Sequence, residues 1–210
     1  MKPSDSIKVQ LIDYLLRGVV PASTMIGCEV PYLGGKRWVD ILLMTKQRLV
    51  AYEIKSESDS LRRFEKQCPD YLATFDMTFL VVSDRQIKSF NLERYPKSLG
   101  IITYKPDDFK FSIKRKPIFS EKQSKLNLSY FIWKDELSGF QRDSISTAHN
   151  LRINFSKKNS IQLIRKLALN SLRKRYRQRY GRFLKERGQV TTISDLKFLT
   201  DENPPLRKIL

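Results

Sequence analysis

The alternation of apolar and polar positions in the first half of the chain predicts a mixed α/β sheet. Residues 5–17 carry apolar side chains at helical spacing, and Gly18 ends that predicted helix. The segments that follow are rich in β-branched and aromatic residues, as strands are. The predicted strands cover residues 24–30, 37–44, 48–55, 78–82 and 100–104, and the predicted helices between them cover residues 58–75 and 85–92. Pro69 lies inside the first of these helices and predicts a kink or a restart there. Because strands alternate with helices, we expect helices to cover the faces of the sheet.

Beyond residue 120 the strand signals fade, and residues 130–140 and 161–185 show the clearest helical patterns. Most of the formal net charge of +18 lies in this part of the chain. The segment from Arg165 to Arg187 contains ten basic residues and a single acid, Glu186. We therefore predict an α/β domain over residues 1–118 and a basic helical domain over residues 119–210.

The basic run in the second predicted domain indicates a polyanionic partner. Like charges four residues apart destabilise a helix, and bound phosphates would relieve that cost. The predicted nucleic-acid-binding residues are Arg173, Lys174, Arg175, Arg177, Arg179 and Arg182. The same run could instead be a solvated helix face, and Tyr176 and Tyr180 within it are expected to pack inward. A protein partner and a homo-oligomer also remain open.

Composition excludes several other classes of protein. The longest uninterrupted aliphatic stretch, Ile41 to Met44, is far shorter than the roughly 20 apolar residues of a membrane span. Two cysteines and one histidine cannot form a zinc site by themselves. We expect a soluble protein with free thiols in the reducing cytoplasm.

Two acids and a lysine on neighbouring predicted strands form the candidate site. If the hairpin turns tightly at Lys46 and Gln47, Asp40 lies directly opposite Glu53. Lys55, two residues further along, lies on the same face as Glu53. Two facing carboxylates repel each other, and oxygen ligands of this kind suit Mg²⁺ or Mn²⁺ completed by substrate phosphate oxygens. The pattern therefore predicts metal-assisted attack on a phosphodiester, with Lys55 serving the attacking water.

These residues resemble the bipartite signature of the PD-(D/E)XK nuclease superfamily, with Asp40 as its first element and Glu53-Ile54-Lys55 as its second. The helix that follows carries Gln67 and Tyr71, which are similar to the Gln-x-x-x-Tyr element of the RecB-like branch. The resemblance covers about residues 24–105 and is closest to small, largely uncharacterised bacterial and phage members. Its further segments are Tyr52-Glu53-Ile54-Lys55-Ser56, Leu61-Arg62-Arg63, Phe75-Asp76 and Phe79-Leu80-Val81-Val82.

The resemblance implies a restriction-endonuclease-like αβββαβ core and a Mg²⁺-dependent nuclease that acts on DNA rather than RNA. It implies that Asp40 and Glu53 bind the metal, that Glu29 completes the ligand set, and that Gln67 and Tyr71 orient the nucleic acid strand. Asp13 is a weaker candidate for the third ligand, because many members carry that acid on the first helix. For Glu29 the other interpretation is a surface acid, for Gln67 it is a capping amide, and for Tyr71 it is a half-buried core tyrosine. The alternative function is a non-catalytic nucleic-acid-binding or assembly subunit that retains the nuclease fold.

Overall fold

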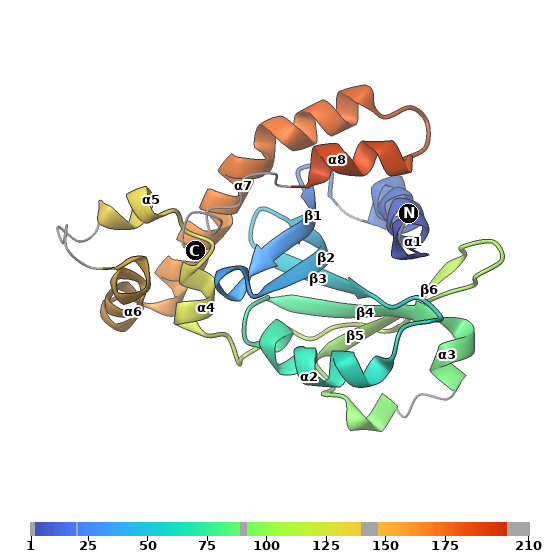
Figure 1. The fold of residues 1–210 in the computed structure, drawn as a ribbon, viewed down its shortest axis with the longest axis horizontal. Helices are drawn as coiled ribbons and strands as arrows, with labels where there is room; N and C mark the ends of the chain where they lie inside the picture. The colour runs from blue at the N-terminus through green and yellow to red at the C-terminus, as the bar shows by residue number, and fades with distance from the viewer. Residues whose placement is uncertain (1–2, 20, 89–91, 140–146, 201–210) are drawn as a thin grey trace.

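The computed structural model of the chain describes residues 3–19, 21–88, 92–139 and 147–200. Its centre is a six-stranded mixed sheet in which the strands lie side by side in chain order (Figure 1). The strands are β1 (Met25–Tyr32), β2 (Arg37–Met44), β3 (Leu49–Ile54), β4 (Met77–Ser83), β5 (Leu99–Tyr104) and β6 (Phe111–Arg115). The central pairs β3–β4 and β4–β5 are parallel, whereas β1–β2, β2–β3 and β5–β6 are antiparallel. The predicted mixed α/β class is confirmed.

The hairpin between β2 and β3 has the predicted register. Ile41 pairs with Tyr52 and Leu43 with Val50, so that paired residue numbers sum to 93. The turn is tight because the Thr45 hydroxyl accepts the backbone N–H group of Arg48 at 2.8 Å, which compensates for a turn sequence without glycine. Continued by one step, this register sets Asp40 opposite Glu53.

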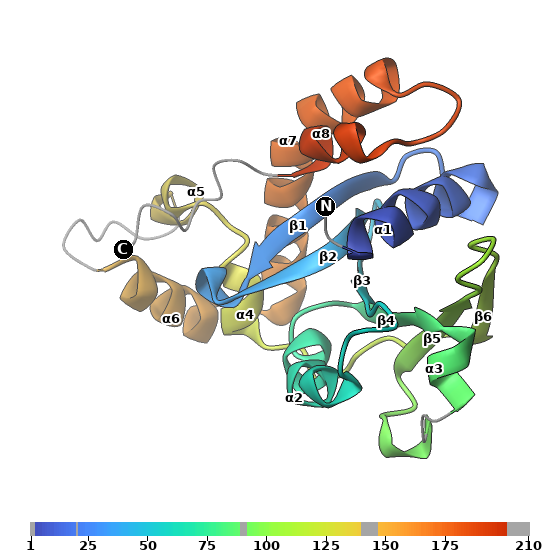
Figure 2. The same cartoon turned by 45° about the vertical axis from the view of Figure 1, so that its right-hand side comes forward.

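Helices lie on both faces of the sheet. They are α1 (Pro3–Tyr14), α2 (Leu61–Leu72), α3 (Asp84–Lys88), α4 (Lys125–Ser129), α5 (Lys134–Ser138), α6 (Ala148–Lys158), α7 (Ile161–Glu186) and α8 (Leu196–Leu199). Figure 2 shows α1 and α8 on the side of the sheet opposite α2. One hydrophobic cluster joins α2, α4 and the first half of α7 to the sheet, and a second joins α1, α8 and the end of α7 to it. No helix in the described part of the chain is both long and apolar enough to cross a membrane.

Several elements differ from the sequence prediction. Helix α2 runs through Pro69 without interruption, although Pro69 has no N–H group to donate to the carbonyl four residues before it. Of the predicted helix over residues 130–140, the structure has only the short α5 over residues 134–138, after α4 has ended at Ser129, and Phe140 lies outside the described residues. Between α4 and α5, the carbonyl oxygens of Phe131 and Ile132 accept hydrogen bonds from Arg175 at 2.7 Å and Arg152 at 3.0 Å, respectively. Those arginines replace the hydrogen bonds that a continuous helix would supply. Neither β6 nor α6 was among the predicted elements.

The basic C-terminal segment packs directly on the sheet. Tyr176 of α7 is buried in the same hydrophobic cluster as Val30 of β1 and Phe75. Both Tyr176 and Tyr180 are buried, so the prediction that they pack inward is confirmed. The predicted division into domains at residue 118 stays a prediction.

The close approach of α7 to β1 requires a glycine at position 27. A Cβ atom on Gly27 would lie 2.7 Å from the Tyr176 ring and 2.9 Å from the Val30 side chain. We therefore expect Gly27→Ala to lower the free energy of unfolding by about 2 kcal/mol, through overpacking. The matched control is Gly181→Ala on the exposed side of α7, where a Cβ atom would meet no other atom within 4 Å. Alanine at this helical position should stabilise the protein by roughly 0.5–1 kcal/mol. Urea unfolding measures both, and equal effects would contradict the close packing.

Candidate functional site

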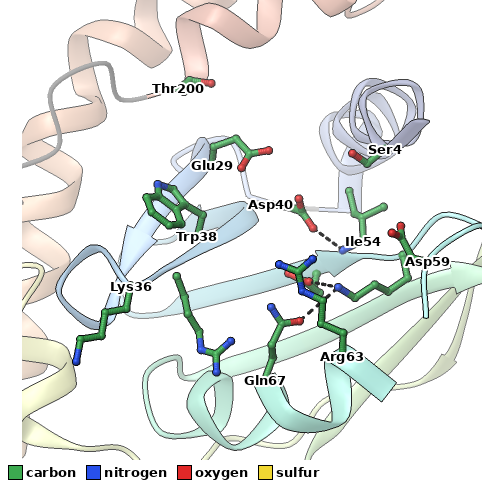
Figure 3. Close-up of a pocket in the computed structure, with 13 residues that line it drawn as sticks. Ser4, Glu29, Lys36, Trp38, Asp40, Ile54, Asp59, Arg63, Gln67 and Thr200 are labelled. Atoms are coloured by element: carbon green, nitrogen blue, oxygen red, sulfur yellow. Dashed lines mark hydrogen bonds and ion pairs between the residues drawn. The ribbon is translucent and has the colours of Figure 1, made fainter. Parts of the chain in front are cut away.

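A cavity of about 600 Å³ opens where β1, β2 and β3 meet α1 and α2 (Figure 3). Asp40, Glu53 and Lys55 all line it, together with Glu29 and Gln67. The exposed groups on its lining include Lys36, Trp38, Asp59 and Arg63. The three strands and α2 therefore bring five of the six predicted site residues to the lining of one cavity. The sixth, Tyr71, is fully buried next to it.

Two side chains hold Glu53 on the α2 side of the sheet, and a third holds one of them. The Lys55 ammonium lies 2.5 Å from Glu53 Oε1, and the buried Tyr71 hydroxyl donates a hydrogen bond to Glu53 Oε2. Lys55 also donates to Gln67 Oε1 at 3.4 Å. Because the Tyr71 side chain has no exposed surface, it orients Glu53 rather than contacting a ligand in the cavity. Gln67 orients Lys55 in the same manner.

Burial raises the pKa of Glu53 from 4.5 to about 7, and the negative charge of Asp40 adds to the shift. Lys55 and the Tyr71 hydroxyl act in the opposite direction without cancelling it. Burial, together with the charge of Glu53, also raises the pKa of Tyr71, which keeps its hydroxyl protonated as a donor. Burial and the nearby carboxylate of Asp40 therefore disfavour the ionised form of Glu53.

This raised pKa predicts that the protein loses stability as the pH rises. Between pH 4.5 and about 7 the folded state binds more protons at Glu53 than the unfolded state, so the free energy of unfolding falls. In a chelator-treated sample we expect a loss on the order of 3 kcal/mol across that range. Urea unfolding at pH 5 and pH 8 measures it. In Glu53→Gln, which cannot ionise, the loss should be much smaller, and an unchanged loss would refute the assignment to Glu53.

Asp40 connects the hairpin to helix α1. Its Oδ2 atom accepts the backbone N–H group of Ile54 at 2.8 Å, and its Oδ1 atom lies 3.1 Å from the Lys8 ammonium. Lys8 also forms an ion pair with Glu29. Its side chain is only 2 % exposed, although it carries a charge. Asp40 therefore contributes both to the backbone geometry of β3 and to a buried ion pair.

Glu29 is the point at which β1 changes its orientation. Its φ angle of 49° lies in the left-handed region, which is uncommon for residues other than glycine. Ile26 and Cys28 before it pack into the cluster that contains α1, whereas Val30 and Tyr32 after it pack into the cluster that contains α2. The pairs on either side, Cys28 with Ile41 and Val30 with Val39, set Glu29 opposite Asp40. Strained backbone of this kind concentrates at functional sites.

The predicted three-acid ligand set is not gathered around one point. Among the residues that the structure describes, no three His, Cys, Asp or Glu side chains are close enough to hold a metal ion together. The carboxylate of Glu29 contacts Lys8, and its role as a metal ligand stays a prediction. Asp13 lies outside the cavity, where it accepts hydrogen bonds from Arg187 at 2.8 Å and from the Thr191 hydroxyl at 2.5 Å. The geometry therefore explains Asp13 as a residue that attaches α1 to the chain after α7.

Three of the six predicted nucleic-acid-binding residues donate to backbone carbonyl oxygens within the protein. Arg173 donates to the carbonyl oxygens of Met44 and Thr45 at 2.6 and 2.9 Å. Arg175 and Arg179 also donate to backbone carbonyl oxygens, of Phe131 and Thr200. The other three, Lys174, Arg177 and Arg182, are exposed, and the Arg182 guanidinium lies 4.9 Å from the Phe198 ring centre. The run thus contributes to the attachment of α7, and its exposed half remains the predicted phosphate contact.

Among the residues that sequence reasoning missed are Trp38, which lines the cavity, and Lys8, which is buried behind it against Glu29 and Asp40. Lys8 had a signal, because it lies beside Ile7 and three residues before Leu11, on the apolar face of the first helix, where a solvated lysine is out of place. Trp38 lies two residues before Asp40 on β2, and both line the cavity. Its side chain is 52 % exposed, which is unusual for the largest aromatic residue.

Comparison with known proteins places the chain in a family. Among solved structures, the SPO1766 protein of unknown function from Silicibacter pomeroyi matches with a TM-score of 0.44 and 18 % identity, over 90 % of this chain and 97 % of that one. Among curated proteins, protein cII of Enterobacteria phage P4 is 24 % identical over 204 residues, which cover 92 % of this chain and 76 % of that protein. The family model described as bacteriophage P4 protein cII matches residues 2–200. Because that match spans almost the whole chain, the protein belongs to the bacteriophage P4 protein cII family.

Proposed function

We propose that this protein is a Mg²⁺- or Mn²⁺-dependent nuclease with a restriction-endonuclease-like core, which hydrolyses phosphodiester bonds in DNA. The observation that carries the proposal is the meeting of Asp40, Glu53 and Lys55 in one cavity, with the Lys55 ammonium 2.5 Å from Glu53. The chain order of α1, β1 to β3, α2 and β4 supports the proposed core. The net charge of +18 favours a polyanionic substrate.

The donor atoms in the cavity fit a hard divalent cation. Asp40 and Glu53 offer carboxylate oxygens, the ligands that Mg²⁺ and Mn²⁺ prefer, and the lining includes Ile54, whose carbonyl oxygen is a further donor of the same kind. The raised pKa of Glu53, caused by burial and by the charge of Asp40, fits a place for added positive charge. Asp40 and Glu53 would hold the ion, which would supply charge neutralisation at a phosphate and acidify a bound water.

The side chains around the cavity have separate roles in the proposed reaction. Lys55 donates hydrogen bonds to the attacking water as that water loses a proton to bulk solvent, and so stabilises the hydroxide that adds to phosphorus. The ester oxygen leaves as the new bond forms, and it takes up a proton from solvent. Tyr71 is a positioning residue, because it holds Glu53 and has no exposed surface, and Gln67 holds Lys55 from the wall of the cavity.

The test is a cleavage assay on plasmid, linear duplex and single-stranded DNA with Mg²⁺ or Mn²⁺. We expect cleavage by the wild type that chelator abolishes and that Lys55→Ala lacks. Gel shift in chelator, at increasing salt, measures binding separately, because contacts to phosphates weaken as salt rises. Cleavage that survives both chelator and Lys55→Ala would reject the assignment of the site.

The alternative is a non-catalytic nucleic-acid-binding or assembly subunit with the same fold. One observation favours it: the Lys8 ammonium already lies against Asp40 and Glu29, and so offsets part of their charge without a metal. Salt-sensitive gel shifts without cleavage of any substrate in Mg²⁺ or Mn²⁺ would support this alternative over the nuclease.

The two tryptophans can distinguish the two surfaces that could hold DNA. Trp38 lies at the cavity, and Trp133 lies 5.5 Å from the Arg175 guanidinium beside the basic run of α7. Because bases stack on exposed indoles, we expect oligonucleotides to quench the fluorescence of Trp133→Phe, which retains Trp38. We also expect Trp38→Ala to weaken binding about tenfold, within the roughly 1–3 kcal/mol of a stacked base. Quenching confined to Trp38→Phe, which retains Trp133, would instead place DNA along α7.

A further inference from the structure

Lys8 is a buried cation that the proposed chemistry leaves unused. It lies on α1 among buried apolar side chains, including Ile7 and Leu11, and its ammonium contacts carboxylates from two strands. Burial of a lysine is costly unless the charge is paired. Burial works to lower the pKa of Lys8, but the charges of Asp40 and Glu29 raise it above its ordinary value, so the ammonium keeps its charge.

The backbone of β1 is shaped around this contact. Glu29 adopts a left-handed conformation, and the strand changes the face on which it packs at that residue. A regular strand would not require the strain, which is typically of the order of 1–3 kcal/mol. The bend leaves the Glu29 carboxylate paired with Lys8 at the cavity.

We propose that Lys8, buried behind the wall of the cavity, occupies the space between the Glu29 and Asp40 carboxylates and so excludes one divalent ion from it. The cavity then holds a divalent ion only on the side of Asp40 that faces Glu53, and Glu29 positions Lys8. Lys8 neutralises charge on the Glu29 and Asp40 carboxylates, as a divalent ion between them would. The proposal rests on the proposed function for the ion at Glu53, but the effect of removing Lys8 is measured separately.

The experiment counts Mn²⁺ ions bound per chain by electron paramagnetic resonance of the free ion, on full-length protein stripped with chelator. Lys8→Met keeps most of the side-chain volume and removes the charge, so Glu29 and Asp40 lose their cation. We expect Lys8→Met to bind one more Mn²⁺ ion than the wild type. The matched control, Lys8→Arg, keeps the charge and should bind the wild-type number. In the double variant Lys8→Met with Glu29→Gln, the additional ion should be lost again.

The comparison remains informative whether or not the protein is a nuclease. A wild type that binds no Mn²⁺ and cleaves nothing rejects the proposed function, whereas a gain of one ion in Lys8→Met still supports the role of Lys8. The same number of ions in Lys8→Met and wild type overturns the proposal, and so does a gain in Lys8→Arg. If Lys8→Met does not fold, as judged by its circular dichroism, Lys8→Gln takes its place. Its amide can still donate to Glu29, which supports folding, and it carries the same expectation because it also removes the positive charge.

Discussion

Replacing Asp40 with asparagine is expected to reduce metal-dependent DNA cleavage by about 10³-fold, a loss of roughly 4 kcal/mol in transition-state stabilisation. The amide oxygen of asparagine can still accept the Ile54 N–H group that Asp40 accepts at 2.8 Å, so the end of β3 should keep its geometry. What disappears is the negative charge that would hold the divalent ion with Glu53. DNA binding in chelator should be unchanged or tighter, since removal of an acid weakens repulsion of phosphates.

The matched control is Asp59→Asn on the lining of the same cavity. Asp59 accepts hydrogen bonds from the backbone N–H group and the hydroxyl of Ser56, at 2.8 and 2.6 Å, and so stabilises the turn before α2. We expect its replacement to change the cleavage rate less than tenfold. Comparable losses of cleavage rate in Asp40→Asn and Asp59→Asn would mean that the rate depends on the total negative charge of the cavity lining. The specific role of Asp40 would then be rejected.

The largest effect on stability is expected at Asp76, which joins the sheet to the C-terminal helices. This buried carboxylate accepts the Leu49 N–H group at 2.7 Å and pairs with Arg165 of α7 at 2.6 Å. Gln123 donates to it as well, at 3.2 Å. Asp76→Ala leaves all three donors without their acceptor, and we expect the free energy of unfolding to fall by about 3 kcal/mol.

The control for Asp76 is another aspartate paired with an arginine, Asp107, whose partner is Arg85 at 3.1 Å. The Asp107 side chain is 82 % exposed, and pairs of this kind contribute little because water screens them. Asp107→Ala should therefore change stability by less than about 1 kcal/mol in urea unfolding. A small effect at both positions would show that the contacts of Asp76 do not attach α7 to the sheet.

Local pattern was sufficient for the sheet and for part of the candidate site. The bounds of β2 and the register of the β2–β3 hairpin follow from period-two alternation and a short turn, both of which involve residues near each other in sequence. The closeness of Glu53 and Lys55 follows from the same alternation. Strand β6 was missed because its residues are mostly half-buried or exposed, so its edge position weakens the pattern.

The sequence by itself determined the order of strands and helices through the five predicted strands, the pair of acids on one hairpin, and the excess of positive charge after residue 120. Only the tertiary structure decided how those charges are used. Arg173 donates to a carbonyl 129 residues away, and Lys8 reaches Glu29 from a different element. Periodicity reports which face of an element is apolar, but the partner of a charge depends on which distant segment packs against it. That information arises only when α1 and α7 dock on the sheet.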